Sequence, residues 1–128
     1  MPDSKETQMR DYYDMYTSDL TNELLGHKIT AINRSNNSLI LDDGTVLKFK
    51  DAGECCSWWA VDNIDEIDLE DNIVTDVIRW PGENEAFTLN ILSRDKKIAA
   101  ISVIGTAGTG YYCHSVRLLV YPPKEENK

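Results

Sequence analysis

The spacing of the hydrophobic residues changes near Gly26. Upstream of that glycine, apolar residues recur four positions apart, which is the spacing of one face of a helix. Thr17-Ser18-Asp19 supplies residue types that can interrupt one helix and begin another, and Gly26 is of the type that commonly ends one. The pattern therefore predicts one long or two short helices over residues 8–25, with a face formed by Tyr12, Tyr16, Leu20 and Leu24.

The predicted helical face is rich in aromatic residues. Met9 and Tyr13 lie beside the stripe of tyrosines and leucines. Tyr and Met are common in protein cores, and both are enriched where subunits meet. Two roles therefore remain open for this helix, namely packing against the rest of the chain or contact with a second copy in a homo-oligomer.

Downstream of Gly26, apolar and polar residues alternate, as in antiparallel strands that have one solvated face. Asp43-Gly44 lies between two such runs and predicts a two-residue hairpin turn in which both residues adopt positive φ. From Ile98 to Ile104 both faces are apolar, so we expect this run to be the central strand. The predicted strands cover residues 28–34, 39–42, 45–50, 73–80, 86–93, 98–104 and 111–121.

The segment from Asp51 to Asn72 fits the alternation least well. Ile64 and Ile67 are three residues apart with acidic residues between them, which predicts a short acidic helix docked on the sheet. The expected fold class is α+β, an N-terminal helix followed by a mostly antiparallel β-sheet of about six to seven strands. We expect a helical extension over residues 1–26, a sheet domain over residues 27–121 and a disordered tail over residues 122–128.

The composition is typical of one folded domain. The chain has 128 residues, of which 41% are hydrophobic and 27% charged. No apolar run approaches the roughly 18 residues that span a bilayer, and the N-terminus lacks an apolar signal segment. Three cysteines, two of them adjacent, make a poor disulfide framework. We therefore expect a cytoplasmic protein that makes no membrane contact.

The net charge of −9 is concentrated in one stretch. Residues 51–76 hold nine of the 22 acidic residues and none of the 13 basic ones, so the rest of the chain is neutral. A surface of this sign repels phosphate, which argues against direct binding of nucleic acid. Either the stretch is a solvated acidic surface, or it faces a basic partner, for which a mimic of DNA is one form.

Metal binding and catalysis both need side chains that converge. The available thiol and imidazole groups belong to Cys55, Cys56, Cys113, His114 and His27. Neighbours in an extended chain point to opposite sides, so each adjacent pair can direct only one ligand to a common zinc ion. Nothing in the sequence holds Cys56 and His114 together as a nucleophile and its base. We expect no metal, no cofactor and no enzymatic activity.

A loop of glycine and threonine, residues 105–110, is the best candidate for ligand binding. It lacks the Gly-Lys-Ser/Thr ending of a Walker loop and the helix that follows a dinucleotide fingerprint. Its amides can still surround an anion, or the loop simply joins two strands. Arg117 either pairs with a carboxylate or holds a phosphate, and aromatic rings near it suit stacking on a base. The candidate ligand-binding residues are Trp58, Trp59, Gly108, Thr109, Gly110, Tyr111, Tyr112 and Arg117.

Two short motifs carry a family resemblance. Residues 53–57, Gly-Glu-Cys-Cys-Ser, and residues 110–112, Gly-Tyr-Tyr, with Ser115 downstream, resemble elements shared by an uncharacterised family of small phage and prophage proteins. The likeness spans Leu24 to Tyr121. The sequence departs from the family pattern at Cys113-His114, where paired glycines are usual. It also departs in its N-terminal extension, which suggests an added oligomer contact.

The size and layout are similar to those of phage anti-Thoeris proteins, which sequester cyclic ADP-ribose-type signals as oligomers. This resemblance implies a non-catalytic homo-oligomer in the host cytoplasm that binds a small nucleotide-like signal, which includes cyclic oligonucleotides. Aromatic rings would then stack on the base, and Arg117 with the glycine loop would hold the phosphates. The alternative is an acidic inhibitor or adaptor that covers a basic surface of a host protein.

Overall fold

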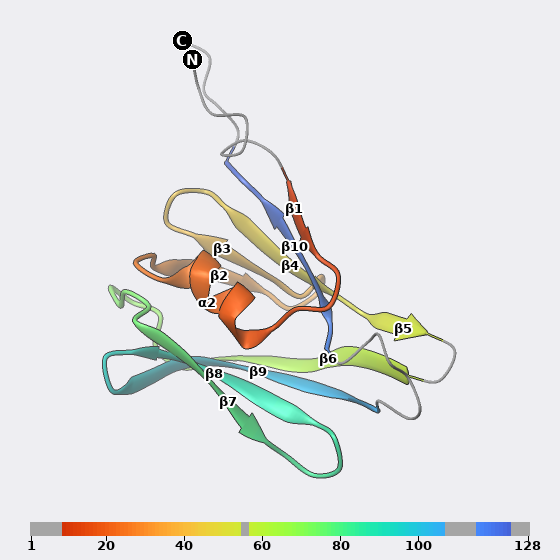
Figure 1. Cartoon of the computed structure of the whole chain (residues 1–128). Helices are drawn as coiled ribbons and strands as arrows, with labels where there is room; N and C mark the ends of the chain where they lie inside the picture. Colours follow the sequence, from red (N-terminus) through yellow and green to blue (C-terminus); the bar gives the residue numbers. More distant parts are fainter. Residues whose placement is uncertain (1–8, 55–56, 107–114, 124–128) are drawn as a thin grey trace.

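The chain folds into two antiparallel sheets that share one hydrophobic core (Figure 1). The structure is a computed structural model and describes residues 9–54, 57–106 and 115–123. Each sheet has five strands, in the order β1-β10-β4-β3-β2 in the first and β5-β6-β9-β8-β7 in the second. The expectation of a mostly antiparallel β protein with a helix is confirmed. The described residues form ten strands in two sheets, where six to seven strands were expected.

The first sheet contains the first and last described strands as neighbours. Arg10 is the cross-strand partner of Val120, and Leu118 is that of Phe49. In β4 the expected alternation is confirmed, because Leu47 and Phe49 are buried while Lys50 is exposed. The strands of this sheet are β1 (Arg10–Tyr12), β2 (Ile29–Asn33), β3 (Ser38–Leu41), β4 (Val46–Lys50) and β10 (Arg117–Tyr121).

The second sheet is built from one continuous stretch of chain. Its central strand is the one expected from the doubly apolar run, and Ile98, Ala99, Ala100 and Ile101 are all buried in it. The strands are β5 (Ala52–Glu54), β6 (Ser57–Glu66), β7 (Asp76–Pro81), β8 (Phe87–Ser93) and β9 (Lys96–Thr106).

The one helix of the described residues, α2 (Thr17–Leu24), places Leu20 and Leu24 in the core. The Asp19 carboxylate accepts a hydrogen bond from the Tyr16 amide at 2.8 Å, which satisfies one donor at the helix start. Gly26 follows the helix with φ of 82°, as expected for a C-terminal cap. This helix is too short and polar to cross a membrane, and the described residues contain no other.

The prediction of helix over the whole of residues 8–25 is wrong for its first half. Residues 10–12 form β1, and Tyr16 is exposed at the helix start. The four-residue spacing there is incidental, because β1 is fixed by hydrogen bonds to β10, about a hundred residues away in sequence.

The prediction of an acidic helix after residue 51 is also wrong, since β6 runs through this segment. Its pairing with β9 shifts register between Val61 and Asn63, so one extra residue is inserted at Asp62. The bulge puts Val61 and Ile64 on the same face although they are three residues apart. The prediction rested on Ile64 and Ile67, and these two residues do not belong to one element. Ile67 lies beyond the strand and is exposed.

Asp43-Gly44 forms the expected hairpin by a different turn. The Leu41 amide donates to the Thr45 carbonyl and the Gly44 amide donates to the Leu41 carbonyl. Only Gly44 has positive φ, at 93°, so the loop has three residues, a type I turn followed by a left-handed glycine.

Candidate interaction face

The outer side of the second sheet is open and carries large apolar side chains. Residues of its inner side, among them Trp59, Ile64 and Leu89, are buried against the first sheet. Cross-strand partners share a face, so the register assigns the outer side without ambiguity. Its central residues are Trp58, Ala60, Asn63 and Asp65 of β6, Ala100, Ser102, Ile104 and Thr106 of β9, Thr88, Asn90 and Leu92 of β8, and Asp76, Ile78 and Trp80 of β7.

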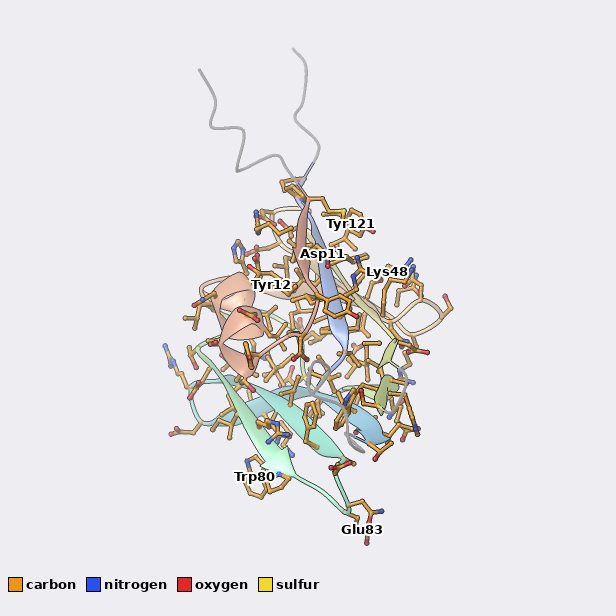
Figure 2. The ribbon with its side chains drawn as sticks, turned by 45° about the vertical axis from the view of Figure 1, so that its right-hand side comes forward. Asp11, Tyr12, Lys48, Trp80, Glu83 and Tyr121 are labelled. Atoms are coloured by element: carbon orange, nitrogen blue, oxygen red, sulfur yellow. The ribbon has the colours of Figure 1, made fainter. Side chains whose placement is uncertain are left out.

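We call this surface the two-tryptophan face. Trp80 is 62% exposed and Trp58 is 50% exposed, while Ile78 and Ile104 are 39% and 37% exposed. Figure 2 shows the Trp80 side chain pointing away from both sheets. Exposed tryptophans and isoleucines on one side of a single sheet, with polar residues between them, are typical of an interaction surface.

Small residues separate the two tryptophans. Thr88 of β8 and Ser102 of β9 lie between Trp80 of β7 and strand β6, as successive cross-strand partners. Asn90 and Ala100, which are partners one step further along the same side of β8 and β9, are buried. The Asn90 Oδ1 atom is buried and accepts no hydrogen bond. The middle of the face is therefore formed by small and polar residues, and the large apolar side chains lie around them.

Carboxylates without basic partners border the face. Asp65 accepts a hydrogen bond from Asn63 at 2.6 Å, and Asp76 accepts one from the Val77 amide at 2.8 Å. No Lys or Arg of the described residues forms an ion pair with Asp62, Asp65 or Asp76.

Two acids in the link from β6 to β7 differ from these three, because each forms an ion pair with a lysine of the same chain. The Lys96 ammonium lowers the pKa of Asp68, chiefly by its hydrogen bond at 2.9 Å. The Lys28 ammonium lowers the pKa of Asp71 in the same way, at 2.6 Å. The unpaired negative charge of the acidic stretch thus includes the acids of β6 and of the start of β7.

The sequence-predicted ligand residues do not form one site within the described residues. Arg117 lies on β10 of the first sheet and donates to both carboxylate oxygens of Asp11, at 2.9 and 2.5 Å. This hydrogen bonding lowers the pKa of Asp11. Of the two roles considered for Arg117, the structure shows the carboxylate pair.

The two tryptophans of the predicted set are in the second sheet and have opposite environments. Trp59 is buried, with its ring centroid 6.0 Å from that of Phe87, whereas Trp58 is half exposed. The remaining members lie outside the described residues, namely Gly108, Thr109, Gly110, Tyr111 and Tyr112, as do Cys55, Cys56, Cys113 and His114.

One group of possible metal ligands occurs in the described residues. His27, Asp42 and Asp43 place their ligand atoms within 4.8 Å of one another. The Asp43 carboxylate accepts from the Thr45 amide at 2.9 Å within the β3–β4 hairpin. The Asp42 carboxylate joins this hairpin to the residues before β2, through His27 Nδ1 at 2.8 Å and the Lys28 amide at 3.2 Å. These hydrogen bonds explain why the three side chains lie close together.

Two surface hollows lie away from the two-tryptophan face. The larger, about 720 Å³, lies between the link preceding β7 and the β8–β9 turn. The smaller, about 290 Å³, lies at the start of α2, where the Arg79 guanidinium is 4.2 Å from the centroid of the Phe87 ring. Neither has a histidine or cysteine among its described lining residues.

The comparisons with known proteins identify a family. Residues 22–118 match the family described as Domain of unknown function (DUF7448). The chain belongs to the DUF7448 family. No curated protein and no solved structure matches it. The DUF7448 match covers α2 from Asn22 onward, all of the second sheet and most of the first, so the two-tryptophan face lies within it.

The sequence does not identify this face as a site. Trp80 and Ile78 belong to none of the predicted ligand-binding residues, and Ile104 is only the end of the doubly apolar run. Alternation could show that Trp58 and Trp59 face opposite ways. It could not show which side of the sheet is left uncovered, because this depends on how the two sheets pack.

Proposed function

We propose that this DUF7448 protein is a non-catalytic binding protein that takes a basic protein partner onto the two-tryptophan face. The proposal rests on the exposure of Trp58 and Trp80 on one side of a single sheet. Exposed tryptophans are enriched among the residues that dominate the energy of protein interfaces. The protein would act as an inhibitor or adaptor, in the host cytoplasm if it is phage-encoded.

The charge of the face selects the partner. Asp62, Asp65 and Asp76 lie on or beside the apolar surface and have no basic partner in the described residues. Carboxylates at the rim of an interface speed the approach of a basic protein and oppose an acidic one. We therefore expect apolar groups of the partner at the centre and Lys or Arg around them.

The test is capture from a bacterial lysate by immobilised protein, followed by measurement of the purified pair. Trp80→Ala and Trp58→Ala should each weaken binding by roughly tenfold or more, as loss of an interface hot spot does. Tyr121→Ala is the matched control, because Tyr121 is an exposed aromatic residue of the first sheet. Equal binding by all three variants would reject the proposal.

A second candidate function is capture of a nucleotide-derived immune signal. One observation favours it, because the exposed Trp58 is the cross-strand partner of Thr106, the last residue of β9, which belongs to the glycine-threonine sequence of residues 105–110. An aromatic ring beside such a loop suits a base whose phosphates bind the loop amides.

A thermal-shift experiment distinguishes the two candidate functions. A ligand that binds only the folded state raises the melting temperature. Cyclic ADP-ribose isomers and cyclic oligonucleotides should give a rise that Trp58→Ala abolishes and Trp80→Ala preserves. No shift with any of these compounds would exclude them as the signal.

A further inference from the structure

β7 is the edge strand of the second sheet, and α2 packs near it without bonding to its backbone. Its six residues pair with β8 on one side, and no other backbone group of the described residues bonds to the opposite side. Exposed edges of this length invite pairing with another strand unless they are blocked. Pro81 closes one end, and the other residues of the strand retain their amides.

One hydrogen bond shows which backbone groups face outward. The Val77 amide donates to its neighbour's side chain, Asp76 Oδ1, at 2.8 Å, which places this amide on the open side. Alternate residues of an antiparallel strand direct their backbone groups to the same side. The Arg79 amide therefore also faces outward, together with the carbonyls of Val77, Arg79 and Pro81. An incoming strand meets three acceptors and one unbonded donor.

We infer that the partner binds by adding an extended segment to β7, in antiparallel or parallel pairing, as a sixth strand of this five-stranded sheet. The inference rests on the proposed function and specifies how the partner is held. Alternate side chains of the added strand would lie beside Trp80 and Ile78, extending the two-tryptophan face. The others would lie beside Val77 and Arg79 on the inner side.

The occupant is a basic segment of another protein. Asp76 lies on the two-tryptophan side of β7 and has no Lys or Arg partner in the described residues, so a basic side chain placed opposite it is attracted. The long stem of a lysine can at the same time cover the Trp80 ring. A second copy fits less well, because it brings a further net charge of −9 and symmetric pairing about Arg79 sets two arginines opposite each other.

The probe is a fluorescein-labelled peptide of alternating lysine and valine, about eight residues long to match a strand. Binding to the full-length protein is followed by fluorescence anisotropy. We expect saturable binding that weakens between about 50 and 300 mM salt, since charge attraction is screened. A glutamate–valine peptide is the charge control and should not bind.

Arg79 allows the backbone and the side chain to be tested separately. Arg79→Pro removes the outward amide and leaves the β8 side of β7 intact, whereas Arg79→Ala removes only the side chain. Arg79→Pro should bind the peptide roughly tenfold more weakly than Arg79→Ala, which corresponds to one backbone hydrogen bond. A peptide methylated on alternate backbone nitrogens should lose binding to the unaltered protein, a result that does not depend on how well a variant folds.

Each outcome decides between the two claims. If Trp80→Ala abolishes peptide binding but Arg79→Pro equals Arg79→Ala and backbone methylation has no effect, strand addition is wrong and docking on the face stands. If the tryptophan variants bind normally, the proposed function fails. Failure of the lysine–valine peptide to bind the unaltered protein overturns the inference. Self-association that strengthens with salt and is lost in Arg79→Pro assigns the edge to a second copy and also overturns it.

Discussion

At the scale of single residues, the local environment of Trp59 depends on Gly105. These two residues are cross-strand partners on β6 and β9. A Cβ atom added at Gly105 would lie 2.3 Å from the Trp58 carbonyl oxygen and 2.4 Å from Cε3 of the Trp59 ring. Neither group can withdraw, because one is backbone and the other is a buried ring in the core. The absence of a side chain at residue 105 is therefore what lets Trp59 fill the core between the sheets.

We expect Gly105→Ala to destabilise the fold by about 3 kcal/mol, the upper part of the range for overpacked cores. The measurement is urea denaturation followed by tryptophan fluorescence. Gly53→Ala is the matched control, because its new Cβ would meet the Ser57 carbonyl oxygen at an ordinary 3.6 Å. Equal stability of the two variants would show that the Trp59 ring can move aside.

The site could be predicted from sequence only in part, and Trp58-Trp59 shows why. Strict alternation in β6 fixes that one ring points inward and the other outward, and the structure agrees. For Arg117 the sequence left two roles open, because the pairing of Asp11 with it joins residues 106 positions apart. Contacts of such separation are set by tertiary packing, which local patterns do not encode.

At the scale of elements, β1 is attached to α2 by a polar cluster. The Glu23 carboxylate accepts from Arg10 Nε and Nη2, both at 2.8 Å, and from the Tyr12 hydroxyl at 2.6 Å. Burial alone would raise the pKa of Glu23, but these hydrogen bonds outweigh it and the pKa is lowered. Burial, with the bond to Glu23, raises the pKa of Tyr12 to about 12.

We expect Glu23→Gln to lower the free energy of unfolding at pH 7 by about 1.5–3 kcal/mol, as for hydrogen bonds to charged groups. A carboxyl with a lowered pKa stabilises the fold above its unfolded pKa and loses this effect as the pH falls through its folded pKa. The unaltered protein should therefore lose stability on acidification more steeply than the variant. The measurement is a series of urea denaturations from neutral pH down to about pH 3.

The control for this cluster is Asp11→Asn. Asp11 and Arg117 form a solvent-exposed pair, and such pairs contribute little. If Glu23→Gln proves no more destabilising than Asp11→Asn, the cluster does not hold β1 to the helix.

The elements that the sequence predicted well are those defined by local pattern. The β4 alternation, the central strand β9 and the helix end at Gly26 all follow from nearby residues. β1 was misread because a long-range pairing fixes it, and β6 was misread because Ile67, three residues after Ile64, lies beyond the end of the strand. A bulge at Asp62 also interrupts the alternation of β6. A one-residue insertion changes the spacing of inward residues from two to three, and only the partner strand reveals it.

At the scale of the whole molecule, α2 contributes leucines to the core, while aromatic side chains before and at its start are exposed. Leu20 and Leu24 belong to the core, whereas Tyr13 and Tyr16 before and at the helix start are exposed. The helix is thus part of the fold. The expectation that it also carries a homo-oligomer contact stays a prediction, and Tyr16 is the most exposed aromatic residue of this segment.

If Tyr16 is at a subunit contact, Tyr16→Ser should lower the molar mass measured by light scattering without changing the melting temperature of the dissociated protein. Aromatic rings of this kind contribute strongly to interfaces, and serine removes nearly all of the apolar area. Tyr121→Ser, an exposed tyrosine of the first sheet, serves for comparison and should leave the mass unchanged. A monomeric unaltered protein would refute the expectation.

The place of β10 between β1 and β4 has a consequence for the order of folding. During translation the second sheet, from Ala52 to Thr106, can assemble as soon as it leaves the ribosome. The first sheet cannot, because β1 and β4 lack the strand that joins them until residues 117–121 emerge. In the nascent chain, the apolar inner side of the second sheet is therefore not fully covered by the first sheet. A premature stop near residue 116 would leave this apolar layer exposed to chaperones and proteases.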